Sequence, residues 1–250
     1  MNLSPRIPAA IATAFRHGTA LKIISGLGQF DPQRVAAVVT AAHHGGATYV
    51  DIAADPALVQ LVATLTQLPI CVSAIAPEAL VQCVSAGAAM VELGNYDSFY
   101  GTGREFSATE VLALAQQTQA LLPNVPLAVT VPHTLSLSEQ VDLAEALEAA
   151  GADILQTEGG TSSSPQSAGT LGLMEKATPT LAAAYELSRA VAIPVLCASG
   201  ITNVTAPLAI AAGAAGVGVG SAVHRLEDPV AMVAAVRSLR ESLARQTAIV

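Results

Sequence analysis

The chain is poor in charged residues, and poorer still in positive ones. Only 12% of its 250 residues are charged, and 11 Lys and Arg stand against 19 Asp and Glu, which gives a formal net charge of -8. This balance, without any basic cluster, opposes binding to nucleic acid or to an anionic membrane surface. Hydrophobic residues make up 52% of the chain. That content predicts a compact body whose strands are covered on both faces, as a parallel sheet requires.

Cysteine is scarce too, and widely spaced. Cys71, Cys83 and Cys197 form no CxxC pair and have no metal-ligand spacing, so they predict neither a disulfide framework nor a zinc site. A reducing compartment fits such cysteines best. We predict no bound metal.

Segments typical of membrane or secreted proteins are missing as well. Residues 190–224 carry no Asp, Glu, Lys or Arg, but Pro194 and Pro207 interrupt the run, which makes it a poor transmembrane helix. The first 15 residues lack the charged start and long apolar centre of a signal peptide. We therefore expect no membrane insertion.

What the chain does contain is a repeat. Gly-Ala precedes a short apolar run four times, and Pro precedes a similar run three times between them. Each run reads as a buried strand that follows a helix. With one leading run the sequence predicts eight strands: 21–25, 48–52, 70–74, 89–93, 127–131, 153–157, 195–199 and 215–219.

Helical segments separate these runs, and several have a recognisable start. A capping side chain precedes a proline at Asp31-Pro32, Asp55-Pro56, Thr178-Pro179 and Asp228-Pro229, an arrangement typical of a first helical turn. Eight strand-helix units predict an α/β fold, a single (β/α)8 TIM barrel over residues 1–250. An open doubly wound sheet is the alternative. Residues 4–17 would form an extra N-terminal helix that plugs the barrel floor.

Alignment of the repeats predicts which side chains point into the barrel, because neighbours along a strand face opposite sides. The inward set includes Lys22, Asp51 and Glu92. We consider these three candidate catalytic residues, with Lys22 as a proton carrier, an electrostatic stabiliser or a Schiff-base amine. A buried structural ion pair is the alternative. The whole inward set is Lys22, Asp51, Ser73, Glu92, Thr130, Gln156, Ala198 and Gly218.

Two glycine turns predict a phosphate site. Ser199 and Gly200 follow the seventh strand, and Gly220 and Ser221 follow the eighth. In many barrels these two loops gather backbone N–H groups around a phosphate. The alternative is that the glycines serve only the tight turns.

Two long loops are candidate covers for such a ligand. The first, 95–106, includes Tyr96 and Tyr100, on which a flat ring could stack, or it covers a small separate core. The second, 159–177, is either a lid or a plain surface loop. The predicted ligand-binding residues at its root are Gln156, Glu158, Gly159 and Gly160.

Among the five histidines, only His133 is predicted at a catalytic position. It follows the fifth strand, and an imidazole there could act as general acid or base, or it could be an exposed loop residue.

The chain also resembles a known family in several phrases: LKIISGLGQFD, QTEGGTSS, EKATPTLAAAYELS, CASGIT and GVGVGSAV. They resemble the hypothetical chloroplast reading frame twenty-three (ycf twenty-three) family of cyanobacteria and algal plastids, over residues 20–225. The resemblance implies a barrel and a location in cyanobacterial cytoplasm or plastid stroma. It implies no reaction. The end of the chain is more remotely similar to flavin-mononucleotide (FMN) oxidoreductases and phosphosugar barrels.

Three functions remain open. The first is a lyase, aldolase or isomerase of a phosphorylated metabolite. The second is an FMN-binding oxidoreductase with the phosphate at Gly200 and Gly220. The third is a barrel without catalysis that senses a metabolite or docks on a partner, and charge-poor helices also allow a homo-oligomer.

Overall fold

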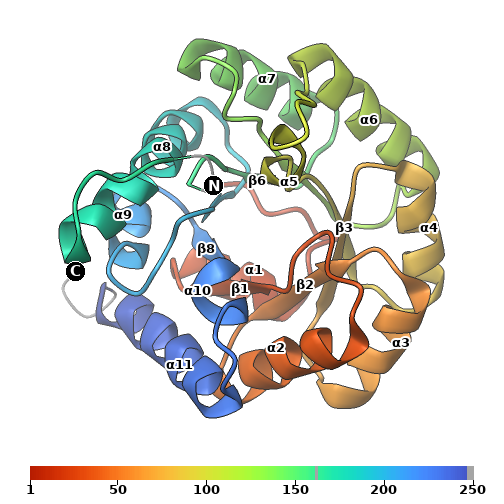
Figure 1. The fold of residues 1–250 in the computed structure, drawn as a ribbon. Coiled ribbons are helices and arrows are strands. Elements are labelled where there is room, and N and C mark those ends of the chain that lie inside the picture. Colours follow the sequence, from red (N-terminus) through yellow and green to blue (C-terminus); the bar gives the residue numbers. More distant parts are fainter. Residues whose placement is uncertain (161–162, 247–250) are drawn as a thin grey trace.

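The computed structural model describes residues 1–160 and 163–246. Its eight parallel strands close into a barrel in the order β1 to β8, with helices around the outside (Figure 1). The predicted TIM barrel is thus confirmed. The strands are β1 (Ala20–Ile24), β2 (Tyr49–Ala53), β3 (Ile70–Ala74), β4 (Met90–Leu93), β5 (Leu127–Thr130), β6 (Ile154–Gln156), β7 (Val195–Ala198) and β8 (Gly216–Val219).

The helices begin where the capping pattern predicts in most repeats. Asp31 and Asp55 accept hydrogen bonds from the first free N–H groups of α2 and α3, and a proline follows each. Within the described ranges none of the helices is long and apolar enough to cross a membrane. The helices are α1 (Ala9–Arg16), α2 (Pro32–Gly45), α3 (Pro56–Leu65), α4 (Pro77–Ser85), α5 (Asp97–Tyr100), α6 (Ala108–Leu121), α7 (Leu137–Ala149), α8 (Gly169–Ala190), α9 (Ala206–Ala211), α10 (Ser221–His224) and α11 (Pro229–Gln246).

The predicted helix start at Thr178-Pro179 is wrong. Helix α8 begins ten residues earlier, at Gly169, and Pro179 lies inside it. A proline inside a helix lacks the N–H that would bond the carbonyl four residues before. The Glu175 carbonyl therefore loses its usual donor, and one residue earlier the Met174 carbonyl accepts from the Thr178 hydroxyl at 3.0 Å. Almost half of the second predicted loop, from Gly169 to Ala177, is therefore helix.

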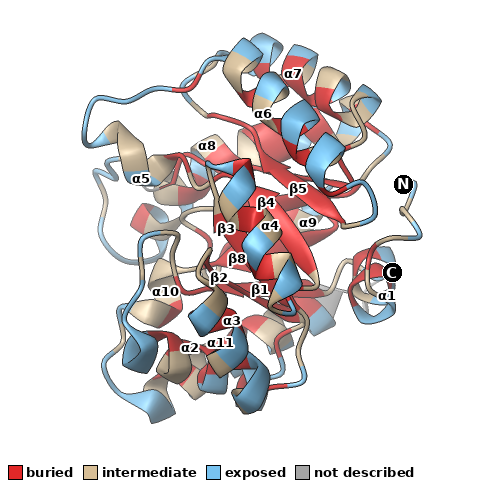
Figure 2. Ribbon diagram, turned by 90° about the vertical axis from the view of Figure 1, so that its right-hand side faces the viewer, coloured by how far each residue is buried: buried red, intermediate tan, exposed pale blue. Residues whose placement is uncertain are grey.

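Helix α1 closes the floor of the barrel, as predicted. Its Ile11 and Phe15 pack on the lowest inward residues, among them Tyr49 and Met90. Arg6, just before the helix, binds Asp153 at 2.9 Å. Helices α5 and α10 lie at the opposite end (Figure 2), where the strands have their carboxyl ends. That end is the open mouth.

The predicted inward and outward faces are also confirmed. Val50, Val91 and Val217 pack in the core between strands and helices. Lys22, Asp51 and Glu92 are at most 1% exposed, and Lys22 forms an ion pair with each of the two acids inside the barrel. The interior thus has an apolar floor and a polar layer above it.

Candidate functional site

The polar layer is centred on Lys22. Its Nζ lies 2.5 Å from Glu92 Oε2, 3.3 Å from Asp51 Oδ2 and 2.9 Å from Gln156 Oε1. Gln156 Nε2 donates to Glu92 Oε1 at 2.8 Å, and Ser73 donates to Asp51 at 2.6 Å. The layer brings together residues from β1, β2, β3, β4 and β6, and every charge in it has a partner.

Burial and charge act in opposite directions on this layer. Burial lowers the pKa of Lys22, but Asp51 and Glu92 together raise it well above its ordinary value. Burial raises the pKa of Glu92 to about 7, against the pull of Lys22. A lysine with a raised pKa stays protonated and is a poor nucleophile. The geometry therefore argues against a Schiff-base role for Lys22.

Above this layer lies a cavity of about 210 Å³ at the mouth. The turns after β7 and β8 both line it, with Ser199, Gly200, Gly220 and Ser221, so the structure brings the four predicted phosphate residues together. The N–H groups of Gly200, Gly220 and Ser221 donate no hydrogen bond within the described chain. Backbone N–H groups around a concave turn can bind an anion.

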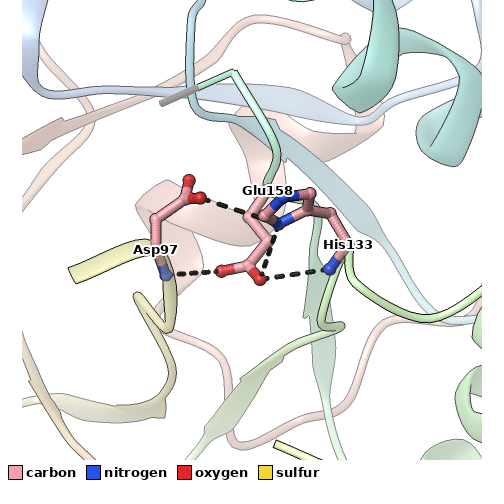
Figure 3. A group of neighbouring side chains, drawn as sticks. All are labelled: Asp97, His133 and Glu158. Carbon is pink, nitrogen blue, oxygen red and sulfur yellow. Dashed lines mark hydrogen bonds and ion pairs between the residues drawn. The ribbon is translucent and has the colours of Figure 1, made fainter. Parts of the chain in front are cut away.

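Asp97 and Glu158, which follow β4 and β6, also line the cavity. His133 lies beside them (Figure 3) but does not line the cavity itself. His133 Nδ1 lies 3.3 Å from Glu158 Oε1 and 3.6 Å from Asp97 Oδ1. Asp97 Oδ2 accepts the Ser199 hydroxyl at 2.7 Å, which joins these residues to the phosphate turn. We call Asp97, His133 and Glu158 the mouth cluster.

The mouth cluster suits proton transfer. The hydrogen bond that His133 Nδ1 donates to Glu158 raises the pKa of His133 above its ordinary value. Because Nδ1 faces the carboxylates, Nε2 is left to exchange a proton, and it has no hydrogen bond to the described residues. Glu158 lines the cavity itself, whereas His133 reaches a bound molecule only through its neighbours.

The mouth cluster is also the only group of three or more metal-ligand side chains among the residues described. Its carboxylate oxygens are already occupied, however. Glu158 Oε1 accepts from the Tyr100 hydroxyl and the His133 N–H, and Oε2 accepts from the Asp97 N–H at 3.2 Å. A cation would have to replace these fixed donors, so the geometry favours a hydrogen-bonded proton carrier.

The aromatic loop does not offer a stacking surface. Tyr96 is fully buried and packs on Phe106, with ring centroids 4.3 Å apart. Both rings belong to the main hydrophobic core rather than to a small separate one. Tyr100 donates to Glu158 and thereby helps to position the mouth cluster. The prediction that Tyr96 contacts a ligand finds no support here, and neither does a flavin ring stacked on this loop.

The second loop approaches the phosphate turn closely. A Cβ on Gly160 would lie 2.4 Å from the Ser199 carbonyl oxygen, so only glycine fits there. Residues 161–162, in the middle of the predicted lid, lie outside the described residues. Gln156 and Glu158 line the cavity. Gly159 and Gly160 do not line it, and their lack of a side chain allows the backbone to pass close to its neighbours.

Three residues at the mouth escaped the sequence analysis. Asp97 was hidden within the aromatic loop, although an acid just after a barrel strand is a known signal. His224, at the end of α10, lines the cavity, so His133, the one histidine predicted at a catalytic position, is not the only histidine near the mouth. Arg225 follows it there. The repeat pattern does not predict the four-residue helix α10, so it could not indicate that His224 and Arg225 lie at the mouth.

Comparison with curated proteins places the chain among relatives of similar length. It is 38% identical over 237 residues to "Uncharacterized protein ycf23" of Pyropia yezoensis, which covers 95% of this chain and 87% of that protein. It is 42% identical over 214 residues to the protein of the same name from Cyanophora paradoxa, covering 85% and 88%. These relatives confirm the resemblance found in the sequence.

Comparison with solved structures supports the barrel. Thiamine phosphate pyrophosphorylase from Pyrococcus furiosus superposes with a TM-score of 0.60 at 21% identity, covering 92% of this chain and 98% of that one. The (S)-3-O-geranylgeranylglyceryl phosphate synthase from Thermoplasma acidophilum, in complex with sn-glycerol-1-phosphate, has a TM-score of 0.63 at 14% identity, covering 96% and 99%. At such identities the likeness shows the fold alone.

A family description, "Protein of unknown function (DUF561)", matches residues 7–249. The match spans nearly the whole chain and agrees with the ycf23 relatives. The chain therefore belongs to the DUF561 family.

Proposed function

We propose that this protein binds a phosphorylated small metabolite at the barrel mouth and acts on it as a lyase or isomerase. One observation carries the proposal: the unbonded N–H groups of Gly200, Gly220 and Ser221 line the same cavity as Glu158. A phosphate on these amides would hold the rest of the molecule against a carboxylate that is linked to His133. Lyase and isomerase reactions both need such a proton carrier.

In this proposal the mouth cluster carries out proton transfer, and the Lys22 layer positions a residue of the cavity. Glu158 touches the ligand, and His133 exchanges the proton with it. Lys22, Asp51 and Glu92 lie beneath the cavity and do not line it. They act through Gln156, which they hold at the cavity floor by two hydrogen bonds.

Two further points support a phosphorylated ligand. The structural neighbours include a synthase bound to sn-glycerol-1-phosphate and a thiamine phosphate pyrophosphorylase, and barrels often reuse the turns after β7 and β8 for phosphate. A cavity of about 210 Å³ suits a small metabolite better than a drug-sized ligand. The proposed setting is a cyanobacterial cytoplasm or a plastid stroma.

Binding of phosphate can be tested at Gly220. A Cβ there would meet Ile24 only at 3.6 Å, an ordinary contact, so Gly220→Val should fold and fill the phosphate turn. We expect inorganic phosphate and sn-glycerol-1-phosphate, titrated calorimetrically, to bind the wild type and to lose at least about tenfold in affinity in the variant. Gly101→Val, at an open position away from the cavity, is the matched control. Equal affinity in both variants would refute the site.

The chemistry needs a separate measurement. Dihydroxyacetone phosphate incubated in D2O should exchange carbon-bound hydrogen in the presence of the wild type, followed by proton NMR. Glu158→Gln should slow the exchange by about 100-fold or more, because it removes the base. Tight binding without any exchange would instead support a barrel that binds its metabolite without catalysis.

A further inference from the structure

A second, larger cavity adjoins the proposed phosphate site. It measures about 800 Å³ and lies between the loop after β1, the start of α2 and the segment after α10. Gly26, Leu27, Ser98, His224 and Arg225 line both cavities. One molecule could therefore extend from the first cavity into the second.

The walls of this second cavity hold unused hydrogen-bond donors. The Ser25 hydroxyl is buried, with the residue only 4% exposed, and it has no hydrogen-bond partner. Burying a hydroxyl without a partner costs free energy. The N–H groups of Gly26 and Gly28 also donate to nothing within the described chain. A group with several acceptor oxygens would satisfy them together.

Two guanidinium groups, Arg34 on α2 and Arg225 after α10, line the same cavity. Neither forms an ion pair or a side-chain hydrogen bond with the described residues, whereas Arg6 and Arg104 are each paired with a carboxylate. Two unpaired arginines beside one cavity are unusual in a chain with a net charge of -8. Arginine is well suited to bind phosphate or carboxylate with two hydrogen bonds.

The carboxylates of the same wall do not neutralise these arginines directly. Asp31 is already used, because its side chain accepts the N–H groups of Gln33 and Arg34 at the start of α2. Glu227 is exposed at the rim. His224 lines both cavities. Burial lowers the pKa of His224, and the positive charges of Arg225 and Arg34 lower it further.

We propose that the ligand carries a second anionic group, a phosphate or a carboxylate, which binds in this cavity to Arg34, Arg225 and the Ser25 hydroxyl. This inference rests on the proposed function, since it places the first phosphate on the turns of Gly200 and Gly220. It narrows the substrate class to metabolites with two anionic ends.

The test uses a matched series of probes: propyl phosphate and the bisphosphates of ethane-1,2-diol, propane-1,3-diol and hexane-1,6-diol. At least one bisphosphate should bind the wild type about tenfold or more tightly than propyl phosphate. In the double variant R34Q/R225Q this advantage should vanish. Because Arg225 also lines the first cavity, Arg34→Gln alone, at a residue that lines only the second cavity, should weaken binding of the bisphosphate while the affinity for propyl phosphate stays unchanged. Arg16→Gln, an exposed arginine on the floor helix, controls for the loss of charge alone.

The outcomes separate the two proposals. If propyl phosphate binds but no bisphosphate binds more tightly, the second site is refuted and the phosphate site stands. If R34Q/R225Q keeps the full advantage of the bisphosphate, the second site is refuted as well. If propyl phosphate does not bind at all, or binds equally to Gly220→Val, the proposed function itself has failed. Because R34Q/R225Q changes surface residues, its unaltered melting temperature would show that it folds.

Discussion

Two clusters in this barrel have a similar arrangement of charged groups in different surroundings. Each places one basic nitrogen between two carboxylates: Lys22 with Asp51 and Glu92 in the interior, and His133 with Asp97 and Glu158 at the mouth. The interior side chains are at most 1% exposed, and the ammonium lies 2.5 Å from its nearest carboxylate oxygen. In the mouth cluster the corresponding distance is 3.3 Å, and His133 is 19% exposed.

The difference shows how depth in the barrel limits what an ionic cluster can do. In the interior, no water compensates for a lost partner, so removing one member is costly and the cluster holds the strands and Gln156 in place. At the mouth, a proton can pass to solvent or to a ligand, and a histidine, unlike a lysine, titrates near neutral pH. Depth and residue type together separate the structural cluster from the candidate catalytic one.

The largest effect is expected when the interior cluster loses its lysine. Lys22→Met leaves two buried carboxylates without their cation, and we expect it to lower the free energy of unfolding by about 3–5 kcal/mol. His133→Gln at the mouth should cost less than about 1 kcal/mol, since Glu158 keeps its donors from the Tyr100 hydroxyl and from two backbone N–H groups. Urea denaturation measures both. If the two variants lost similar stability, the contrast between the clusters would be wrong.

The pH dependence of stability sharpens the contrast at Glu92. A carboxyl with a pKa of about 7 when folded and 4.5 in its ordinary state binds its proton more tightly in the folded protein. Stability linked to it is therefore lost as pH rises from about 4.5 to 7, the opposite of a salt-bridged acid. Compared with Glu92→Gln, the wild type should become relatively less stable over this window. A constant difference between the two curves would contradict the raised pKa.

A smaller effect is expected at His133. Its pKa is raised in the folded protein by Glu158, so its protonated form contributes stability that is complete below about pH 6.5, the ordinary histidine value, and is lost as pH rises through the folded pKa. Proton NMR of the imidazole should show titration above the ordinary value. Glu158→Gln should move the pKa back down. An unchanged pKa in that variant would remove Glu158 as the cause.

Much of the framework was predictable because it repeats. Four Gly-Ala phrases and three prolines mark strand beginnings, and the alternation along each strand correctly assigned Lys22 and Gln156 to the interior. The wrong helix start falls where one copy departs from the repeat. Pro179 looks like a helix start, yet α8 extends through it. Tyr96 was predicted to contact a ligand, and the pattern of its loop gave no sign that it is buried against Phe106.

The mouth was harder to predict for a physical reason. Asp97, His133 and Glu158 come from loops after different strands, and their distances depend on how each loop folds back over the barrel. Periodicity indicates which end of a strand a residue follows, but not which residues of neighbouring loops meet there. His224 and Arg225 were missed because the four-residue helix α10 carries no repeat of its own.

The floor helix α1 has a last consequence. Because Ile11 and Phe15 close one end of the barrel and the Lys22 layer fills its centre, the cavity at the mouth opens at one end of the barrel only. Under the proposed function, a substrate and its product would enter and leave through the same opening, so each product would have to dissociate before the next substrate binds.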